Sequence, residues 1–188
     1  MIEKYSLRKN GSKYITNHFQ VREFRCLDGT NTIYIDRNLV IALENVRSKY
    51  KRPIVFNSAY RTVRHNRRVG GVKDSCHIFG KAVDIPYNKD LYTLLKKSGL
   101  YVLNEGSWLH CDSRYIQPHT GRRPLLRKGS KGEWVVYLQH MLTKKGFKCI
   151  KDGAFGKTTK SRVQQFQKRY GLLPDGLVGS KTWNTLQK

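Results

Sequence analysis

The chain has 188 residues, enough for one large or two small domains with buried cores. Apolar residues at 38% and aromatic residues at 11% exclude a wholly disordered protein, and no run of about 18 apolar residues predicts a transmembrane segment. Thirty-seven Lys and Arg against thirteen Asp and Glu give a net charge of +24, which predicts a polyanionic partner: nucleic acid, anionic lipid or anionic cell-wall polymer.

The first 56 residues predict a short strand, a helix and a second strand. Apolar residues in an otherwise polar segment alternate as in a short strand or hook: Phe19, Val21, Phe24 and Cys26. A helix then runs from Asp36, a natural N-cap, towards Pro53, because apolar residues recur at helical spacing: Leu39, Leu43, Val46 and Tyr50. Residues 54–56, Ile-Val-Phe, predict a buried strand leading into Ser58.

A second helix and two strands follow. Residues 89–98 predict an amphipathic helix with Leu91, Leu94 and Leu95 on its inner face, and Gly99 suits its carboxy-terminal cap. Residues 101–103 and 108–111 then predict two short strands joined by residues 104–107.

The composition changes between residues 117 and 132, where three glycines, two prolines and five basic residues indicate a linker or domain edge. Beyond it, the pattern D-G-x-x-G-x-x-T occurs twice, at residues 152–159 and 175–182. Each copy leads into a predicted helix, and with a preceding helix they make a three-helix unit. The apolar residues of these helices are Val135, Leu138 and Leu142, then Val163, Phe166 and Tyr170, then Trp183 and Leu186.

The amino terminus bears on where the protein is made. Residues 1–5 lack the apolar region and cleavage site of a signal peptide, so we expect synthesis in the cytoplasm and, for action outside, release by another route. The four cysteines show no paired spacing, which is consistent with reduced thiols.

Two histidines and one carboxylate form a candidate metal site. His77 and Asp84 bracket Gly80, which allows the chain to turn so that both side chains converge, and His110 on a later strand completes the set. Three such ligands with an open fourth position are typical of catalytic zinc sites, where the pKa of bound water falls to about 7. The sequence therefore predicts a zinc hydrolase with one Zn²⁺ per chain.

The motifs around these ligands resemble those of the D-Ala-D-Ala metallopeptidases of the LAS superfamily, which cleave peptidoglycan stem peptides. The resemblance covers roughly residues 15–117 and rests on Ser58-x-x-Arg61, His65-Asn66-x-x-Val69-Gly70-Gly71, Ser75-x-His77-x-x-Gly80-x-Ala82-x-Asp84 and Trp108-x-His110. It implies that His77, Asp84 and His110 bind the zinc. Arg61 would then bind the scissile carbonyl or its oxyanion, and Ser75 would hydrogen-bond the substrate near the metal.

Two carboxylates compete for the role of general base. Relatives often carry an acidic residue three positions before the last zinc histidine, but Ser107 stands there in this chain. Glu105, on the loop before the strand, is the preferred candidate. Asp112 is the alternative, because it shares a strand face with His110, where it can equally serve to orient that ligand.

The carboxy-terminal residues resemble the three-helix peptidoglycan-binding domain from about 126 to 186. The matching residues are Gly129-x-x-Gly132, Leu138-Gln139, Leu142, Gly146, Asp152-Gly153-x-Phe155-Gly156-x-x-Thr159, Val163-x-x-Phe166-Gln167 and Asp175-Gly176-x-x-Gly179-x-x-Thr182-Trp183. We therefore expect two domains. Residues 1–121 would form an α+β zinc peptidase domain, a small antiparallel sheet with flanking helices, and residues 122–188 an all-α three-helix peptidoglycan-binding domain.

Together these resemblances predict a cell-wall lytic enzyme of the phage endolysin type, which hydrolyses amide bonds in stem peptides or cross-links after release through the membrane. The close alternative is a bacterial autolysin or a spore-associated hydrolase. A protein of another class, a catalytically weak or inactive wall-binding protein, is favoured only by Ser107. The expected partners are peptidoglycan and anionic wall polymers, and the expected state is a monomer. Nucleic acid is not expected, because no recognition motif accompanies the charge. D-Ala-D-Ala carboxypeptidase, endopeptidase and L-Ala-D-Glu cleavage all remain open.

Overall fold

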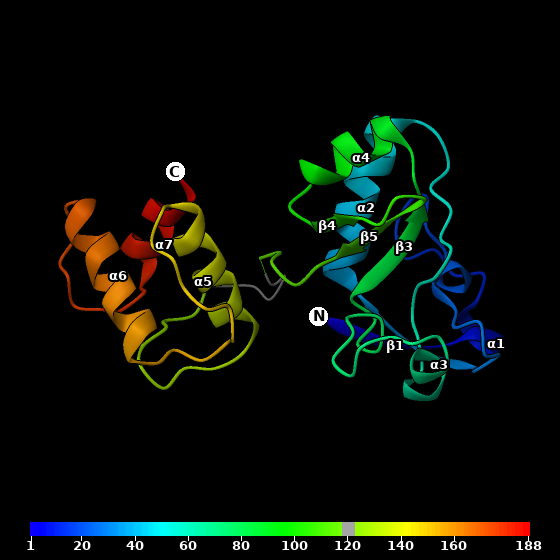
Figure 1. The fold of residues 1–188 in the computed structure, drawn as a ribbon, viewed down its shortest axis with the longest axis horizontal. Helices are drawn as coiled ribbons and strands as arrows, with labels where there is room; N and C mark the ends of the chain where they lie inside the picture. The colour runs from blue at the N-terminus through cyan, green and yellow to red at the C-terminus, as the bar shows by residue number, and fades with distance from the viewer. Residues whose placement is uncertain (118–122) are drawn as a thin grey trace. The chain divides into compact units, whose positions relative to one another are not determined.

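Residues 1–116 and 117–188 form separate units, each with its own apolar core, in this computed structural model (Figure 1). The structure describes residues 1–117 and 123–188. The domain boundary expected between residues 121 and 122 lies outside the described residues.

The strands of the first unit form two small antiparallel sheets (Figure 1). In one, β1 (Ile2–Ser6) pairs with β2 (Thr32–Asp36). The other has the order β3-β5-β4, formed by β3 (Ala82–Pro86), β5 (Trp108–Asp112) and β4 (Tyr101–Asn104). The predicted strands at 101–103 and 108–111 are confirmed, and so is the small antiparallel sheet with helices.

The strand predicted at residues 54–56 is wrong, and of the two alternatives at residues 19–26, a short strand or a hook, the strand does not form. Val21–Phe24 forms a 3₁₀ helix, η1, and residues 53–56 extend without strand pairing. Their aromatic side chains instead cluster with one another, because the Phe56 ring stacks on Phe19 at 5.6 Å between centroids and lies 5.0 Å from Phe24. Tertiary packing therefore buries these residues without a strand ladder.

Four helices complete the first unit: α1 (Leu7–Asn10), α2 (Arg37–Tyr50), α3 (Val63–Arg68) and α4 (Lys89–Lys96). The Asp36 side chain accepts a hydrogen bond from the Asn38 amide at 3.3 Å, which confirms the predicted N-cap of α2. Helix α4 ends two residues before the predicted Ser98, and Gly99 follows with a φ of +85°. Helices α2 and α4 pack against each other, and their buried residues share one core with β3 and β5.

Gly80 sets the position of the turns at residues 73–80 that carry His77. Its carbonyl accepts from the Asp36 amide at 2.8 Å, and a Cβ on Gly80 would lie 2.0 Å from the Tyr34 carbonyl oxygen. Its φ is +65°. Only glycine therefore lets these turns lie so close to β2.

Gly80→Ala is expected to lower the free energy of unfolding of the first unit by about 3 kcal/mol, since it adds left-handed strain to a clash with backbone. Gly99→Ala is a matched control, because Gly99 has a φ of +85° and no atom of the described residues lies within 4 Å of where its Cβ would stand. It should cost about 1 kcal/mol. Denaturant unfolding followed by hydrogen exchange in residues 1–116 measures both, and equal losses would contradict the role of close packing.

Three helices form the second unit: α5 (Glu133–Lys144), α6 (Lys157–Arg169) and α7 (Ser180–Gln187). This confirms the predicted all-α three-helix fold. The predicted apolar residues are buried in its core, with one exception: Tyr170 ends α6 and is 41% exposed.

A buried glutamine explains each copy of the sequence repeat. In both copies its amide nitrogen donates to an Asp side chain, a backbone carbonyl and a Thr hydroxyl, and its oxygen accepts from a glycine amide. The two sets are Gln139 with Asp152, Gly153, Ala154 and Thr159, and Gln167 with Asp175, Gly176, Leu177 and Thr182. The repeat is therefore a scaffold for two similar loops.

Among the described residues, no helix combines the length and the apolar character that a bilayer crossing requires.

Candidate metal centre

Three predicted ligands meet on the face of β3 and β5 that points away from the core. Alternation along the strands turns Val83 and Leu109 into the core and their neighbours Asp84 and His110 to the opposite face, where the register pairs them. His77 reaches the same place from the turns at residues 73–80.

The ligand atoms are close enough to share one ion. His110 Nδ1 lies 3.0 Å from Asp84 Oδ1, His77 Nε2 lies 3.1 Å from the same oxygen, and the two nitrogens are 3.3 Å apart. Tetrahedral zinc with bonds of about 2.0–2.1 Å holds neighbouring donors roughly 3.3 Å apart. The donor set therefore fits a zinc ion in both chemistry and spacing.

Each imidazole is fixed from behind by an acceptor. His77 Nδ1 donates to the Ala59 carbonyl at 2.6 Å, which leaves Nε2 free to face the cluster. His110 donates from Nε2 to Asp112 Oδ2 at 3.0 Å, which leaves Nδ1 to face it. Such acceptors behind metal-binding histidines fix the tautomer and the ring orientation.

The electrostatics of the cluster favour a cation. Burial alone would raise the pKa of Asp84, but hydrogen bonds with His110 and His77 lower it to about 2, with the charge of Arg61 contributing. Burial would lower the pKa of His110, whereas hydrogen bonds with Asp112 and Asp84 raise it to about 9. Two buried carboxylates therefore draw positive charge to this point.

Arg61 and Ser75 lie beside the ligands, as expected of site residues. Arg61 donates from Nη2 to the second oxygen of Asp84 and from Nε to Ser58 Oγ at 2.8 Å, while Nη1 has no acceptor in the described parts of the chain. Ser75 is buried, and its hydroxyl accepts from the His77 amide at 3.4 Å. Arg61 is thus anchored, with one nitrogen left to donate elsewhere.

The two candidate bases occupy different surroundings. Asp112 is fully buried and bonds the nitrogen of His110 that faces away from the ligand atoms, and it is held there by Arg114. Burial would raise the pKa of Asp112, but the hydrogen bonds with His110 and Arg114 lower it. Glu105 is exposed between β4 and β5, where its amide bonds the Trp108 carbonyl at 2.9 Å. Its carboxylate has no hydrogen-bond or ion-pair partner among residues 1–117 and 123–188. Asp112 therefore contacts a predicted metal ligand, whereas the Glu105 carboxylate makes no hydrogen bond to one in the described chain.

Two contributors could not be predicted from the sequence, the Ala59 carbonyl and Arg114. Nothing in the sequence distinguishes one backbone carbonyl from another. Arg114 stands two positions after Asp112, but the chain has 37 Lys and Arg residues, so a basic residue near Asp112 does not stand out in the sequence.

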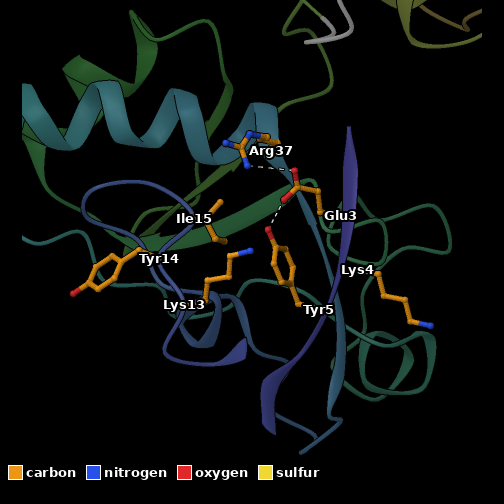
Figure 2. Close-up of a pocket in the computed structure, with 7 residues that line it drawn as sticks. All are labelled: Glu3, Lys4, Tyr5, Lys13, Tyr14, Ile15 and Arg37. Atoms are coloured by element: carbon orange, nitrogen blue, oxygen red, sulfur yellow. Dashed lines mark hydrogen bonds and ion pairs between the residues drawn. The ribbon is translucent and has the colours of Figure 1, made fainter. Parts of the chain in front are cut away.

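A separate pocket of about 510 Å³ lies between β1, the start of α2 and residues 13–15, and contains none of the predicted site residues (Figure 2). Its polar groups bind one another: Glu3 accepts from the Tyr5 hydroxyl and from Arg37 Nη1, the latter at 3.3 Å. Burial, followed by the hydrogen bond with Glu3, raises the pKa of Tyr5 to about 12. This pocket adds no group to the metal centre.

Comparisons with known proteins agree with both predicted resemblances. Residues 17–112, just over half of the chain, match the family Peptidase M15, and residues 131–186 match a putative peptidoglycan binding domain. The chain is 42% identical over 64 residues to the zinc D-Ala-D-Ala carboxypeptidase of Streptomyces albus G, covering 32% of this chain and 25% of that protein. It is 42% identical over 65 residues to the spore cortex-lytic enzyme of Bacillus cereus, covering 34% and 25%.

Among solved structures, the chain is similar to the endolysin of the Burkholderia AP3 phage, at 41% identity over 34% of this chain and 24% of that one, with a TM-score of 0.33. The chain spans about a quarter of the length of the curated relatives it matches.

Proposed function

Since the chain belongs to the Peptidase M15 family, we propose that it is a zinc peptidase that hydrolyses amide bonds in the stem peptides or cross-links of bacterial peptidoglycan. The observation that carries this proposal is the convergence of His77 Nε2, Asp84 Oδ1 and His110 Nδ1 within 3.0–3.3 Å of one another. The peptidoglycan-binding domain supports the same polymer as substrate.

A zinc ion held by these three ligands would polarise the scissile carbonyl and lower the pKa of water. The residues of the chain supply the remaining functions. Arg61, fixed by Asp84 and Ser58, directs its uncommitted Nη1 to the oxyanion that develops on the substrate. Ser75 hydrogen-bonds the substrate beside His77, and Glu105, on the loop before β5, is the proposed general base.

Glu105→Gln is expected to leave zinc binding intact and to reduce hydrolysis by roughly 10²–10⁴-fold, the usual contribution of a positioned general base. Asp112→Asn is the matched comparison. Because Asp112 bonds the outer nitrogen of His110, its loss should act by weakening zinc binding. Zinc content and hydrolysis rate measured on both variants decide between them. Full zinc without turnover in Asp112→Asn, together with an active Glu105→Gln, would reverse the assignment.

Digestion of purified peptidoglycan, with mass spectrometry of the released muropeptides, tests the proposal directly. New peptide termini that depend on zinc would support it, and the identity of the termini distinguishes carboxypeptidase, cross-link endopeptidase and L-Ala-D-Glu cleavage. Cleavage confined to glycan bonds would overturn it.

The proposed setting is the cell wall, reached after synthesis in the cytoplasm and release through the membrane, as in endolysins. A net charge of +24 supports attraction to anionic wall polymers, and we expect a monomer. A second candidate, a catalytically weak wall-binding protein, is favoured by Ser107 and by the exposed, unpartnered Glu105 carboxylate in the described chain. Wall binding without any new peptide terminus would support that candidate.

A further inference from the structure

Arg114 forms several hydrogen bonds with the carboxylate of Asp112, on the side of His110 that faces away from the other ligands. Its Nε lies 2.8 and 2.9 Å from the two oxygens of Asp112, and its Nη2 donates to Oδ2 at 2.6 Å. The Arg114 amide also donates to Oδ1 at 3.0 Å. With the 3.0 Å contact from His110 Nε2, both oxygens of this fully buried carboxylate are hydrogen-bonded.

The guanidinium is itself held in place. Its Cζ lies 4.4 Å from the centroid of the Tyr101 ring, within the range of a cation–π contact. Tyr101 on β4 stands opposite Asp112 in the strand register. Ser113, which lies between Asp112 and Arg114 in the sequence, fixes the backbone at this point. Its amide donates to the Lys81 carbonyl at 3.0 Å, and its hydroxyl donates to Asp36.

The Arg114 side chain and amide hold the Asp112 carboxylate in the orientation that meets His110 Nε2. Without the guanidinium, the carboxylate can rotate away from that nitrogen, and the His110 ring loses the acceptor that fixes its orientation. Its Nδ1 then no longer points to the place where Asp84 Oδ1 and His77 Nε2 converge.

We propose that Arg114, held against the Tyr101 ring, is a positioning residue that fixes the Asp112 carboxylate behind His110 and thereby orients the imidazole so that its Nδ1 faces the other metal ligands. The proposal rests on the proposed function in one respect: the ion that benefits is the zinc assigned to this site.

Zinc affinity, measured by competition with a chelator on the full chain, tests the proposal. Arg114→Gln should bind zinc about 10–100-fold more weakly, the usual effect of losing a residue behind a metal ligand. Arg114→Lys keeps the charge but loses the paired donors of the guanidinium, so its zinc affinity should lie between those of the unmodified chain and Arg114→Gln. Arg25→Gln removes an exposed arginine remote in sequence from the site motifs and should bind as the unmodified chain does.

The Tyr101 ring provides a second matched pair. Tyr101→Phe keeps the aromatic face under Arg114 and should retain zinc affinity, whereas Tyr101→Leu removes the face and should weaken it severalfold. Equal affinities in these two variants would remove Tyr101 from the proposal.

Nitrogen-15 NMR of histidine in the metal-free chain gives a readout that does not depend on zinc. The Nε2 proton of His110 should exchange slowly with solvent in the unmodified protein, because it is hydrogen-bonded to Asp112, and faster in Arg114→Gln. Unchanged exchange of this proton together with unchanged zinc affinity in Arg114→Gln would overturn the proposal. If Arg114→Gln does not fold, Arg114→Lys gives the same comparison. Failure of the unmodified chain to bind zinc would count against the proposed function, while the exchange of the His110 Nε2 proton would still decide the role of Arg114.

Discussion

His77→Ala is expected to abolish stoichiometric zinc binding and to reduce peptidoglycan hydrolysis by roughly 10⁴-fold or more, because the pKa of water returns towards its bulk value once the metal is lost. Among the described residues His77 supplies one of the three ligand atoms that converge, and it is 2% exposed, so its removal leaves an incomplete ligand set at a buried position. Metal analysis of the purified variant, alongside the rate of muropeptide release, measures both effects.

The variant should remain folded, although less stable. Its truncation leaves the Ala59 carbonyl without the 2.6 Å hydrogen bond from Nδ1, which costs about 1–3 kcal/mol when the group stays buried. His18→Ala is a suitable control, because His18 pairs with Glu44 away from the predicted ligands. It should keep its zinc and activity. Undiminished zinc in His77→Ala would refute the ligand assignment.

Elements with strong local signals could be predicted from the sequence. Helix α2 follows a side-chain N-cap at Asp36 and buries residues at helical spacing, and α4 has the same periodicity over a shorter length. Strands β4 and β5 are neighbours in sequence joined by a short turn, so their pairing needs little long-range information.

Elements that depend on distant partners could not be predicted in the same way. Strands β1 and β2 pair across about thirty residues, and nothing in the polar amino terminus marks Ile2–Ser6 as a strand without its partner. The alternation at Phe19–Cys26 instead reflects the 3₁₀ helix Val21–Phe24 and the packing of Phe19 and Phe24 against Phe56. Gln139 and Gln167 match the peptidoglycan-binding domain in sequence, but they lie outside the D-G-x-x-G-x-x-T pattern, 13 and 8 residues before their Asp partners. Their hydrogen bonds to the repeat are therefore seen only in the structure.

The candidate site shows the same division. Residue types and spacing predict His77, Asp84 and His110 as metal ligands, and the structure brings their ligand atoms within 4.8 Å of one another. Which nitrogen of each imidazole faces the cluster depends on the Ala59 carbonyl and on Asp112, and both contacts arise only from tertiary packing. The same holds for Glu105, which is close to His110 in sequence but is exposed and makes no side-chain hydrogen bond to a ligand in the described chain.

Separating the two units should separate hydrolysis from wall binding. Residues 1–116 contain all three metal ligands and a core of their own, so this fragment should retain zinc and cleave small soluble stem peptides at nearly the rate of the full chain. Its clearance of intact walls should fall by roughly 10²–10⁴-fold, the gain that tethering to an insoluble substrate can provide. Residues 117–188 should sediment with purified peptidoglycan without digesting it.

Charge and short-range contacts should contribute separately to that sedimentation. Residues 122–188 contain 16 basic and 3 acidic residues, a net charge of +13, against +11 for residues 1–121, so the smaller part has the higher charge density. Salt screens the long-range attraction to anionic wall polymers within about 10 Å at 0.1 M, but leaves contacts with glycan or peptide largely intact. Sedimentation of the 117–188 fragment should therefore weaken with salt and not vanish. Complete release at high salt would mean that the unit binds the wall only because the wall is a polyanion. A fragment that stays in solution at both low and high salt would contradict wall binding altogether.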